Sequence, residues 1–275
     1  MVRRCLLLLV GLALGVAPAT AQQTNDCLLT VIIEDGDVYD GRGADPVVTD
    51  VGILGDRIAA LGDLDACVAG RRLNARGLAV VPGFIDIHSH GTRGVFRYPL
   101  AENLTRQGVT TAIGGPDGSS PYPIGEYLAQ LDATPPAVNF GLMVGHGTIR
   151  RAVMGNEDRT PTTAELDTMR ALVGRAMADG AFGLSSGLKY VPGAYAETEE
   201  VIALARTLAP AGAMHSTHMR DETAAILDSL DETFEIGRAA GVPVVISHHK
   251  CAGSANHGRT RETLLKIAAA RSDQK

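Results

Sequence analysis

The run VPGFIDIHSHG (81–91) ends an apolar, strand-like segment with two histidines separated by one residue. Alternate side chains of a β-strand share a face, so His88 and His90 point the same way, roughly 6.5–7 Å apart along the strand. Neutral imidazoles held this close are typical ligands of a divalent metal ion. Two histidines can also share a solvated loop, so the rest of the chain has to distinguish these interpretations.

Further histidines stand where other strand-like segments end. They are His146, His215, His218, His248 and His249. A lone histidine on an apolar strand is usually a packed core residue, but imidazoles from several strands at one edge indicate a shared metal site. His248 and His249 are neighbours, and His215 and His218 are three apart, so the members of each pair point to opposite faces. At most one ligand is therefore expected from each pair, and the outward partner, His215 or His249, is expected to pack.

The segments that must position these histidines alternate between strand-like and helix-like patterns after Ala79. The strand candidates are 79–90, 108–115, 137–147, 180–188, 213–219 and 242–250. The helix candidates are 162–180, 198–212, 222–241 and 260–275, the first with Thr163 as its N-cap and Gly180 past its end. Such alternation implies a parallel sheet. Because chemistry-bearing residues stand at the C-terminal ends of the strands, we expect an α/β fold, an incomplete (β/α)8 TIM barrel with about six strands, rather than an open doubly wound sheet.

The N-terminal part shows a different pattern. Short strand-like runs bounded by Gly, Asp and Asn in residues 22–78 predict a small β-sandwich ahead of the barrel portion, residues 79–275. Residues 1–21 combine two arginines, an apolar run and a small-residue Ala-Thr-Ala site, as in a signal peptide. The apolar run is shorter than the ~20 residues of a membrane span. We therefore expect secretion, into the periplasm, with no membrane attachment after cleavage; an uncleaved anchor is the alternative.

Three cysteines, Cys27, Cys67 and Cys251, lie outside the expected signal peptide. In an oxidising compartment Cys27 and Cys67, both in the N-terminal region, are predicted to form a disulfide. Cys251 would then be the odd thiol.

Composition narrows the function classes. The chain is 45% hydrophobic with 32 glycines, and its net charge is −6 without a long basic run, so nucleic-acid binding is not indicated. The SSG at 185–187 is not the G-x-S-x-G elbow of a serine hydrolase.

Several motifs resemble one known family. FIDIHSH (84–90) resembles the metal-binding signature of the amidohydrolase superfamily. Four longer motifs resemble its N-acyl-D-amino-acid deacylase (D-aminoacylase) branch: GVTTAIGGPDG (108–118), GAFGLSSGLKYVPG (180–193), THMRDE (217–222) and AGVPVVISHHKCAG (240–253). The resemblance covers essentially residues 27–260.

The resemblance implies a set of metal ligands. By motif match they are His88, His90, His218 and His248, which agrees with the side-chain parity above. The family's bridging cysteine is matched here by Asp117 in the turn GGPDG. A carboxylate can bridge two ions but is a harder ligand than a thiolate. The alternatives are an ordinary Pro-Asp-Gly turn and a bridge made by Lys189.

For the substrate-binding residues, the resemblance implies a role for Lys250 and leaves the others as candidates. The family implies that Lys250 pairs with the α-carboxylate of the substrate, and Arg220 and Tyr190 are further candidates. Ser186 and His146 are candidates to line the pocket. Asp86 is expected to support the ligands.

The resemblance implies a zinc enzyme with one or two ions that hydrolyses small N-acyl-D-amino acids. Zinc lowers the pKa of bound water to about 7 and polarises the amide carbonyl, so that metal-bound hydroxide attacks that carbonyl. The family's general base, a strand-eight aspartate, has no match, and we expect a C-terminally truncated chain with open sheet edges. The alternatives are a hydrolase of cyclic amides or dipeptides, like dihydroorotase or isoaspartyl dipeptidase, and a non-catalytic fragment.

Overall fold

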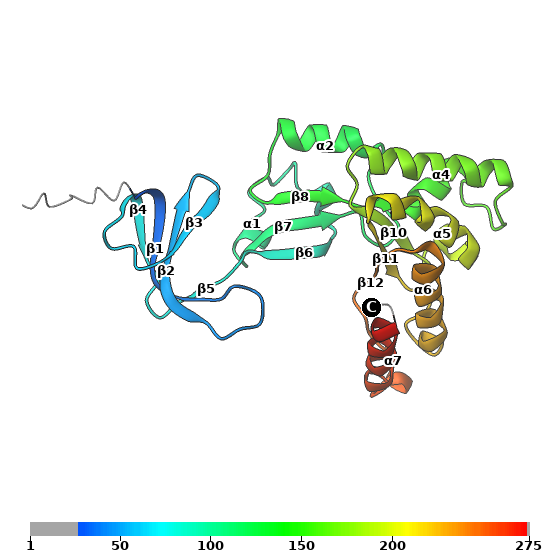
Figure 1. Cartoon of the computed structure of the whole chain (residues 1–275). Helices are drawn as coiled ribbons and strands as arrows, with labels where there is room; N and C mark the ends of the chain where they lie inside the picture. Colours follow the sequence, from blue (N-terminus) through cyan, green and yellow to red (C-terminus); the bar gives the residue numbers. More distant parts are fainter. Residues whose placement is uncertain (1–26, 274–275) are drawn as a thin grey trace, which may run out of the picture. The chain divides into compact units, whose positions relative to one another are not determined.

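The computed structural model describes residues 27–273 (Figure 1). The expected signal peptide lies outside the described residues. The chain divides into two compact units after Pro82, four residues beyond the expected boundary at residue 78. Within residues 27–273, no helix has both the length and the apolar character that crossing a bilayer requires.

The N-terminal unit contains one β-sheet. Its strands are β1 (Leu28–Val38), β2 (Val47–Leu54), β3 (Arg57–Gly62), β4 (Val68–Asn74) and β5 (Ala79–Val80). The strand order is β3-β2-β1-β4, and β5 also pairs with β1. Residues 27–82 thus contain one sheet of the expected β-sandwich portion, and the complete sandwich stays a prediction. The long strand β1 pairs with β2, β4 and β5, so these strands join a single sheet, whereas a sandwich needs a second sheet packed on the first.

A small apolar core and one disulfide hold this unit together. Leu29, Ile32 and Leu64 are buried and pack against Cys27 and Cys67. The predicted disulfide is confirmed: Cys27 and Cys67 are bonded, with their Cα atoms 4.8 Å apart. Cys251 is a free, half-buried thiol.

The C-terminal unit is built on parallel strands. They are β6 (Phe84–Ser89), β7 (Val109–Gly114), β8 (Asn139–Leu142), β9 (Val144–Gly145), β10 (Gly183–Gly187), β11 (Met214–His218) and β12 (Val244–Ile246). They form two sheets, β6-β7-β8 and β12-β11-β10-β9. Only Met143 separates β8 from β9, and the backbone N–H of Phe182 donates to the carbonyl of Leu142 (2.8 Å). The two sheets therefore continue one another, and each of the six strand candidates contains observed strand.

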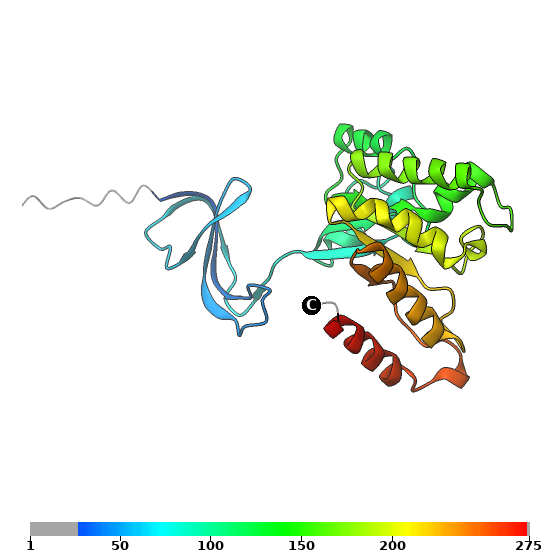
Figure 2. The same cartoon turned by 45° about the vertical axis from the view of Figure 1, so that its right-hand side comes forward.

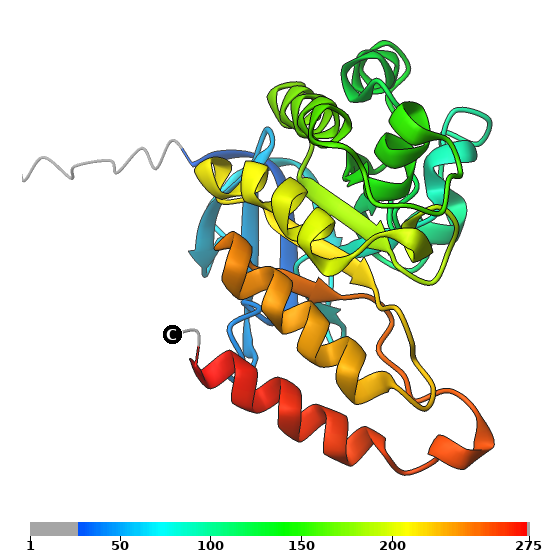
Figure 3. The same cartoon turned by 90° about the vertical axis from the view of Figure 1, so that its right-hand side faces the viewer.

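Helices alternate with these strands along the chain. They are α1 (Glu102–Thr105), α2 (Ile124–Ala133), α3 (His146–Met154), α4 (Thr163–Ala178), α5 (Thr198–Ala205), α6 (Ile226–Ala240) and α7 (Thr260–Asp273). Helices α4 to α7 lie side by side along the sheet in Figures 2 and 3. The main core lies between strands and helices, where Leu142, Val144 and Leu184 pack with Met169 and Leu204. Helices α1, α2 and α3 were not predicted from the sequence.

The N-cap of α4 differs by one residue from the expected Thr163. Thr162 caps the helix: its Oγ1 accepts from the backbone N–H of Glu165 (3.3 Å), and the Glu165 side chain accepts from the backbone N–H of Thr162 (2.8 Å). A capping box needs Glu or Gln three residues after the cap. Only Thr162 of the two threonines has that spacing, so the sequence did contain the correct signal.

Candidate metal centre

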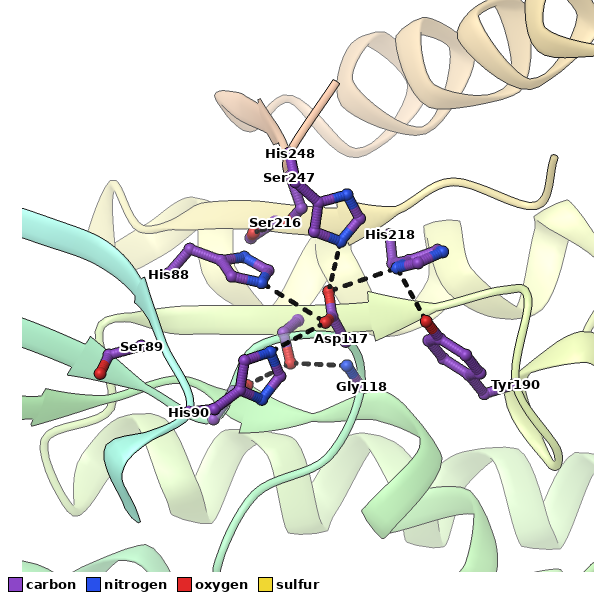
Figure 4. Close-up of polar contacts among 12 residues, drawn as sticks. His88, Ser89, His90, Asp117, Gly118, Tyr190, Ser216, His218, Ser247 and His248 are labelled. Carbon is purple, nitrogen blue, oxygen red and sulfur yellow. Dashed lines mark hydrogen bonds and ion pairs between the residues drawn. The ribbon is translucent and has the colours of Figure 1, made fainter. Parts of the chain in front are cut away.

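Four histidines from three strands converge on one carboxylate. His88 lies in β6 and His90 just after it, His218 ends β11, and His248 follows β12. Asp117 lies in the turn after β7, and the four imidazoles surround it (Figure 4). The structure thus brings together all the residues that the sequence analysis assigned as metal ligands.

The two oxygens of Asp117 face different pairs of imidazoles. Its Oδ2 lies 3.4 Å from His88 Nε2 and 3.3 Å from His90 Nε2. Its Oδ1 lies 3.4 Å from His248 Nε2 and 3.7 Å from His218 Nδ1. The carboxylate therefore lies between two sets of nitrogen ligands.

These contacts fit metal coordination better than hydrogen bonding. N–H···O hydrogen bonds centre near 2.9–3.0 Å. Two ligand atoms that each lie about 2.1 Å from a tetrahedral zinc ion are about 3.4 Å apart. Both ring nitrogens of His88 and the Oδ1 of Asp117 are buried without a hydrogen-bond partner in the part of the chain that the structure describes. The residues fit one divalent ion at His88, His90 and Asp117, and another at Asp117, His218 and His248.

Backbone contacts hold the turn that carries Asp117. Asp117 has a left-handed φ of 54°, which Asp tolerates better than most residues, and Gly118 follows at 75°. The backbone N–H of Gly118 donates to Ser185 Oγ (3.1 Å), and this hydroxyl donates to the carbonyl of Gly115 (2.6 Å). A Cβ on Gly118 would lie 2.7 Å from the backbone nitrogen of Gly187, so only glycine fits there. Sequence reasoning missed the part played by Ser185.

Burial favours the neutral, metal-binding form of two ligands. Desolvation lowers the pKa of His88, although the charge of Asp117 opposes this effect. Desolvation also lowers the pKa of His218, against an opposing effect of Glu222. Neutral imidazole is the form that binds a metal ion.

Glu222 is a site residue that the sequence analysis did not identify. It is buried, 8% exposed, and its Oε1 lies 3.0 Å from His248 Nδ1. Its Oε2 lies 3.5 Å from His218 Nε2 and forms an ion pair with Lys250 Nζ. The only signal in the sequence was its place at the end of THMRDE, four residues after His218.

His146 and Ser186 do not line the metal centre, so these two candidates are corrected. His146 is the first residue of α3, is fully buried, and bonds through Nε2 to Glu200 Oε1 (2.8 Å). Ser186 Oγ bonds to His215 Nε2 (2.9 Å) and to the hydroxyl of Thr217, which are also buried. Side-chain alternation along β10 turns Ser185, not Ser186, toward the Asp117 turn.

The outward histidines pack as expected. His215 is fully buried, and desolvation lowers its pKa to about 3. His249 Nε2 bonds to Thr263 Oγ1 on α7 (2.8 Å). Neither residue contacts Asp117 among the described interactions.

Of the three remaining candidates for substrate binding, Tyr190 and Lys250 lie at the metal centre and Arg220 does not. Arg220 does not face the site: its guanidinium binds Glu232 (2.7 Å) and the carbonyls of Ala194 and Ala196, so its role as a substrate ligand is corrected. The Tyr190 hydroxyl lies 3.3 Å from His218 Nδ1. Lys250 is half exposed and paired with Glu222.

Asp86 was expected to support the ligands, and Lys189 was the alternative bridging residue. Asp86 Oδ1 accepts from the backbone N–H of His88 (3.0 Å), which is the supporting role expected of it. Lys189 is exposed and forms no hydrogen bond or ion pair within residues 27–273. Asp117, not Lys189, lies between the histidines.

Two cavities adjoin the candidate metal centre. One, of about 420 Å³, is lined by residues that include His90, Ser119, Arg151 and Pro192. The other, of about 560 Å³, includes Lys189, Glu222 and Lys250 in its lining. Asp117 and Tyr190 line both. A small molecule can therefore approach the carboxylate from two sides.

Comparison with known proteins identifies the family. The model of the amidohydrolase family matches residues 71–270. A D-aminoacylase of Alcaligenes xylosoxydans xylosoxydans is 43% identical over 275 residues, which cover 92% of this chain and 57% of that protein. An N-acyl-D-glutamate deacylase of the same organism is 39% identical over 265 residues, 88% of this chain and 54% of that protein.

Solved structures agree with this similarity. A crystal structure of D-aminoacylase has a TM-score of 0.86 and 43% identity, covering 90% of this chain and 57% of that one. The N-acyl-D-glutamate deacylase of Bordetella bronchiseptica, solved with zinc and a phosphonate inhibitor, has a TM-score of 0.86 and 36% identity, covering 89% and 56%. The chain thus spans a little over half the length of these relatives. With a family match over most of its length and with imidazoles grouped around a carboxylate, the chain belongs to the amidohydrolase family.

Proposed function

We propose that the protein is a zinc-dependent deacylase of N-acyl-D-amino acids. The arrangement of His88, His90, His218 and His248 around Asp117 is the observation that carries the proposal. The similarity to a D-aminoacylase and to N-acyl-D-glutamate and N-acyl-D-aspartate deacylases supports the substrate class. Zinc is present in one solved relative, and another is described by its binuclear metal centre.

Each ligand set would serve one ion. His88, His90 and Asp117 Oδ2 would hold one, and Asp117 Oδ1, His218 and His248 the other. Bound zinc supplies an activated water near neutral pH and polarises the amide carbonyl. The protein's part is to keep its imidazoles neutral and to hold the substrate beside Asp117.

The substrate's free carboxylate would bind in the cavity that holds Lys250. Lys250 and Tyr190 both line that cavity, and the Lys250 ammonium contacts one of the ligands, His248, at Nδ1 (3.0 Å). A small carboxylate is a suitable partner for an ammonium group beside a phenol hydroxyl.

The proposal includes a (β/α)8 barrel as the fold and the periplasm as the location of the protein. The six parallel strand positions, with helices between them, are consistent with part of a (β/α)8 barrel whose ligands stand at the C-terminal ends of strands. The Cys27–Cys67 disulfide supports an oxidising compartment such as the periplasm, reached by way of the signal peptide.

Assays of the purified, zinc-loaded, full-length gene product test this function. N-acetyl-D-leucine, N-acetyl-D-glutamate and N-acetyl-D-aspartate are compared with their L-enantiomers, and His248→Ala serves as the inactive control. Turnover of the D-enantiomers that is lost in His248→Ala is the expected result. Turnover of hydantoins or isoaspartyl dipeptides alone would favour the cyclic-amide or dipeptide alternative. Stoichiometric zinc without turnover of any amide would contradict a deacylase and favour a non-catalytic metal-binding protein.

A further inference from the structure

We propose that Glu222 is a positioning residue that fixes the tautomers of His218 and His248, and so makes their ion site the tighter of the two. The inference rests on the metal centre of the proposed function. It assigns a role to a buried carboxylate that binds no ion itself.

Two carboxylates flank the same two imidazole rings. Asp117 faces His218 Nδ1 (3.7 Å) and His248 Nε2 (3.4 Å). Glu222 faces the opposite nitrogens, His218 Nε2 at 3.5 Å and His248 Nδ1 at 3.0 Å. Each Glu222 oxygen serves one ring, Oε2 for His218 and Oε1 for His248. The Glu222 carboxylate therefore contacts both rings on the side opposite Asp117.

The tautomers follow from this geometry. A neutral imidazole carries one proton, and the nitrogen that binds a metal ion has to be unprotonated. With an ion on the Asp117 side, the proton of each ring lies on the side of Glu222. Glu222 is then the acceptor for both N–H groups, as outer carboxylates commonly are for metal-bound histidines.

Glu222 is placed to orient the ligands and not to replace one. A direct ligand would have to lie on the same side of the rings as Asp117, beside His218 Nδ1 and His248 Nε2. Glu222 instead lies at their other nitrogens, and it is buried at 8% exposure. Burial makes its hydrogen bonds costly to lose, because no solvent takes the place of a missing partner.

The other pair of ligands lacks such support. Both nitrogens of His88 are without a hydrogen-bond partner among residues 27–273, and the side chain of His90 is 70% exposed. The only carboxylate within ion-pair distance of these rings in that part of the chain is Asp117. The ion at His218 and His248 is therefore expected to bind more tightly than the ion at His88 and His90.

Glu222 also links Lys250 to the occupancy of the site. Lys250 Nζ lies 3.0 Å from His248 Nδ1 and forms an ion pair with Glu222. An ammonium group only donates, so its contact with Nδ1 requires an unprotonated Nδ1. Once an ion occupies Nε2, Nδ1 carries the proton and Glu222 is left as the partner of Lys250.

Zinc titration of two matched variants tests the assignment. Glu222→Gln removes the carboxylate charge beside His218 Nε2 and His248 Nδ1. Glu232→Gln is the matched control, because it removes a partly buried carboxylate charge that pairs with Arg220 and not with a ligand. Zinc affinity of the metal-free proteins is measured by competition with a chromophoric chelator. Glu222→Gln is expected to weaken the tighter binding event 10- to 100-fold and to leave the weaker event unchanged. Glu232→Gln is expected to change neither.

A second readout reports the tautomers themselves. Long-range ¹H–¹⁵N spectra of zinc-loaded, histidine-labelled protein are expected to show an N–H at His218 Nε2 and at His248 Nδ1. Glu222→Asp keeps the charge but shortens the side chain, so it is expected to weaken zinc binding less than Glu222→Gln. If Glu222→Gln does not fold, Glu222→Asp takes its place in the titration. The opposite tautomers, or tight-site affinity within twofold of the unsubstituted protein in Glu222→Gln, would overturn the role of Glu222 alone. If the unsubstituted protein does not bind zinc, the proposed function fails and this inference with it.

Discussion

Ser185 on β10 holds the backbone of Gly118 in the turn after β7: its hydroxyl accepts from the Gly118 N–H at 3.1 Å and donates to the carbonyl of Gly115 at 2.6 Å. Residues far apart in the sequence thereby fix the position of Asp117. The carboxylate that four imidazoles surround depends on a side chain that contacts none of them.

Replacement of Ser185 by alanine should loosen this turn. Two buried backbone groups lose their partner, which typically costs about 1–3 kcal/mol. Urea denaturation of Ser185→Ala, compared with the exposed control Ser254→Ala, measures the loss. A stability within about 0.5 kcal/mol of the control would show that the turn does not need the hydroxyl.

The zinc content of Asp117→Ala and Lys189→Ala distinguishes the two candidate bridging residues. Asp117→Ala should bind about half the zinc of the unsubstituted protein or less, because both ligand sets share that carboxylate. Lys189→Ala should bind the same amount, because Lys189 has no contact with the histidines among the described residues. Elemental analysis after dialysis measures both. Loss of zinc in Lys189→Ala alone would identify the lysine as the bridge.

Glu200 should be important for stability and not for metal binding. Its carboxylate, 4% exposed, binds His146 Nε2 and the fully buried guanidinium of Arg150. Breaking a buried ion pair by removing one partner commonly costs about 3–5 kcal/mol. Glu200→Gln should therefore lower the free energy of unfolding by about that amount, whereas the exposed neighbour variant Glu199→Gln should not. Equal unfolding free energies in the two variants would contradict the importance of this pair.

His215 should make the metal-free protein less stable in acid. Its pKa is about 3 in the folded chain, against an ordinary value of 6.5. Between these values the unfolded chain holds a proton on His215 that the folded chain does not, so stability falls as pH decreases from 6.5 toward 3. The slope from one such group is up to about 1.4 kcal/mol per pH unit.

Urea denaturation at pH 7, 6 and 5 with a chelator present measures this slope. His88 and His218, whose pKa values are also lowered, act in the same direction. His215→Asn should therefore retain a slope that is shallower by about one proton. Identical slopes would show that His215 becomes protonated in the folded state.

The sequence predicted those parts of the molecule that depend on local periodicity. Alternation of side chains separated His218 from His215 and His248 from His249, and the structure places them on those faces. The separation within each pair depends only on spacing along the chain. Asp117 was assigned differently, through the resemblance of the turn GGPDG to the bridging position of the family.

Features that depend on tertiary contacts were missed. The strand before His146 ends at Gly145, two residues before the predicted end, so His146 begins a helix and faces Glu200. Which serine of Ser185 and Ser186 supports the site depends on how β10 lies against the Asp117 turn. Glu222 reaches His248 across 26 positions of sequence, and no local pattern encodes that contact.

Anomalous diffraction at the zinc edge from zinc-soaked crystals examines the ligand arrangement itself. The arrangement predicts a peak about 2.0–2.2 Å from Asp117 Oδ1, His218 Nδ1 and His248 Nε2, with a second, weaker peak beside His88 and His90. Zinc bound elsewhere on the protein, with no anomalous density within bonding distance of Asp117, would contradict the metal centre and the hydrolase built on it.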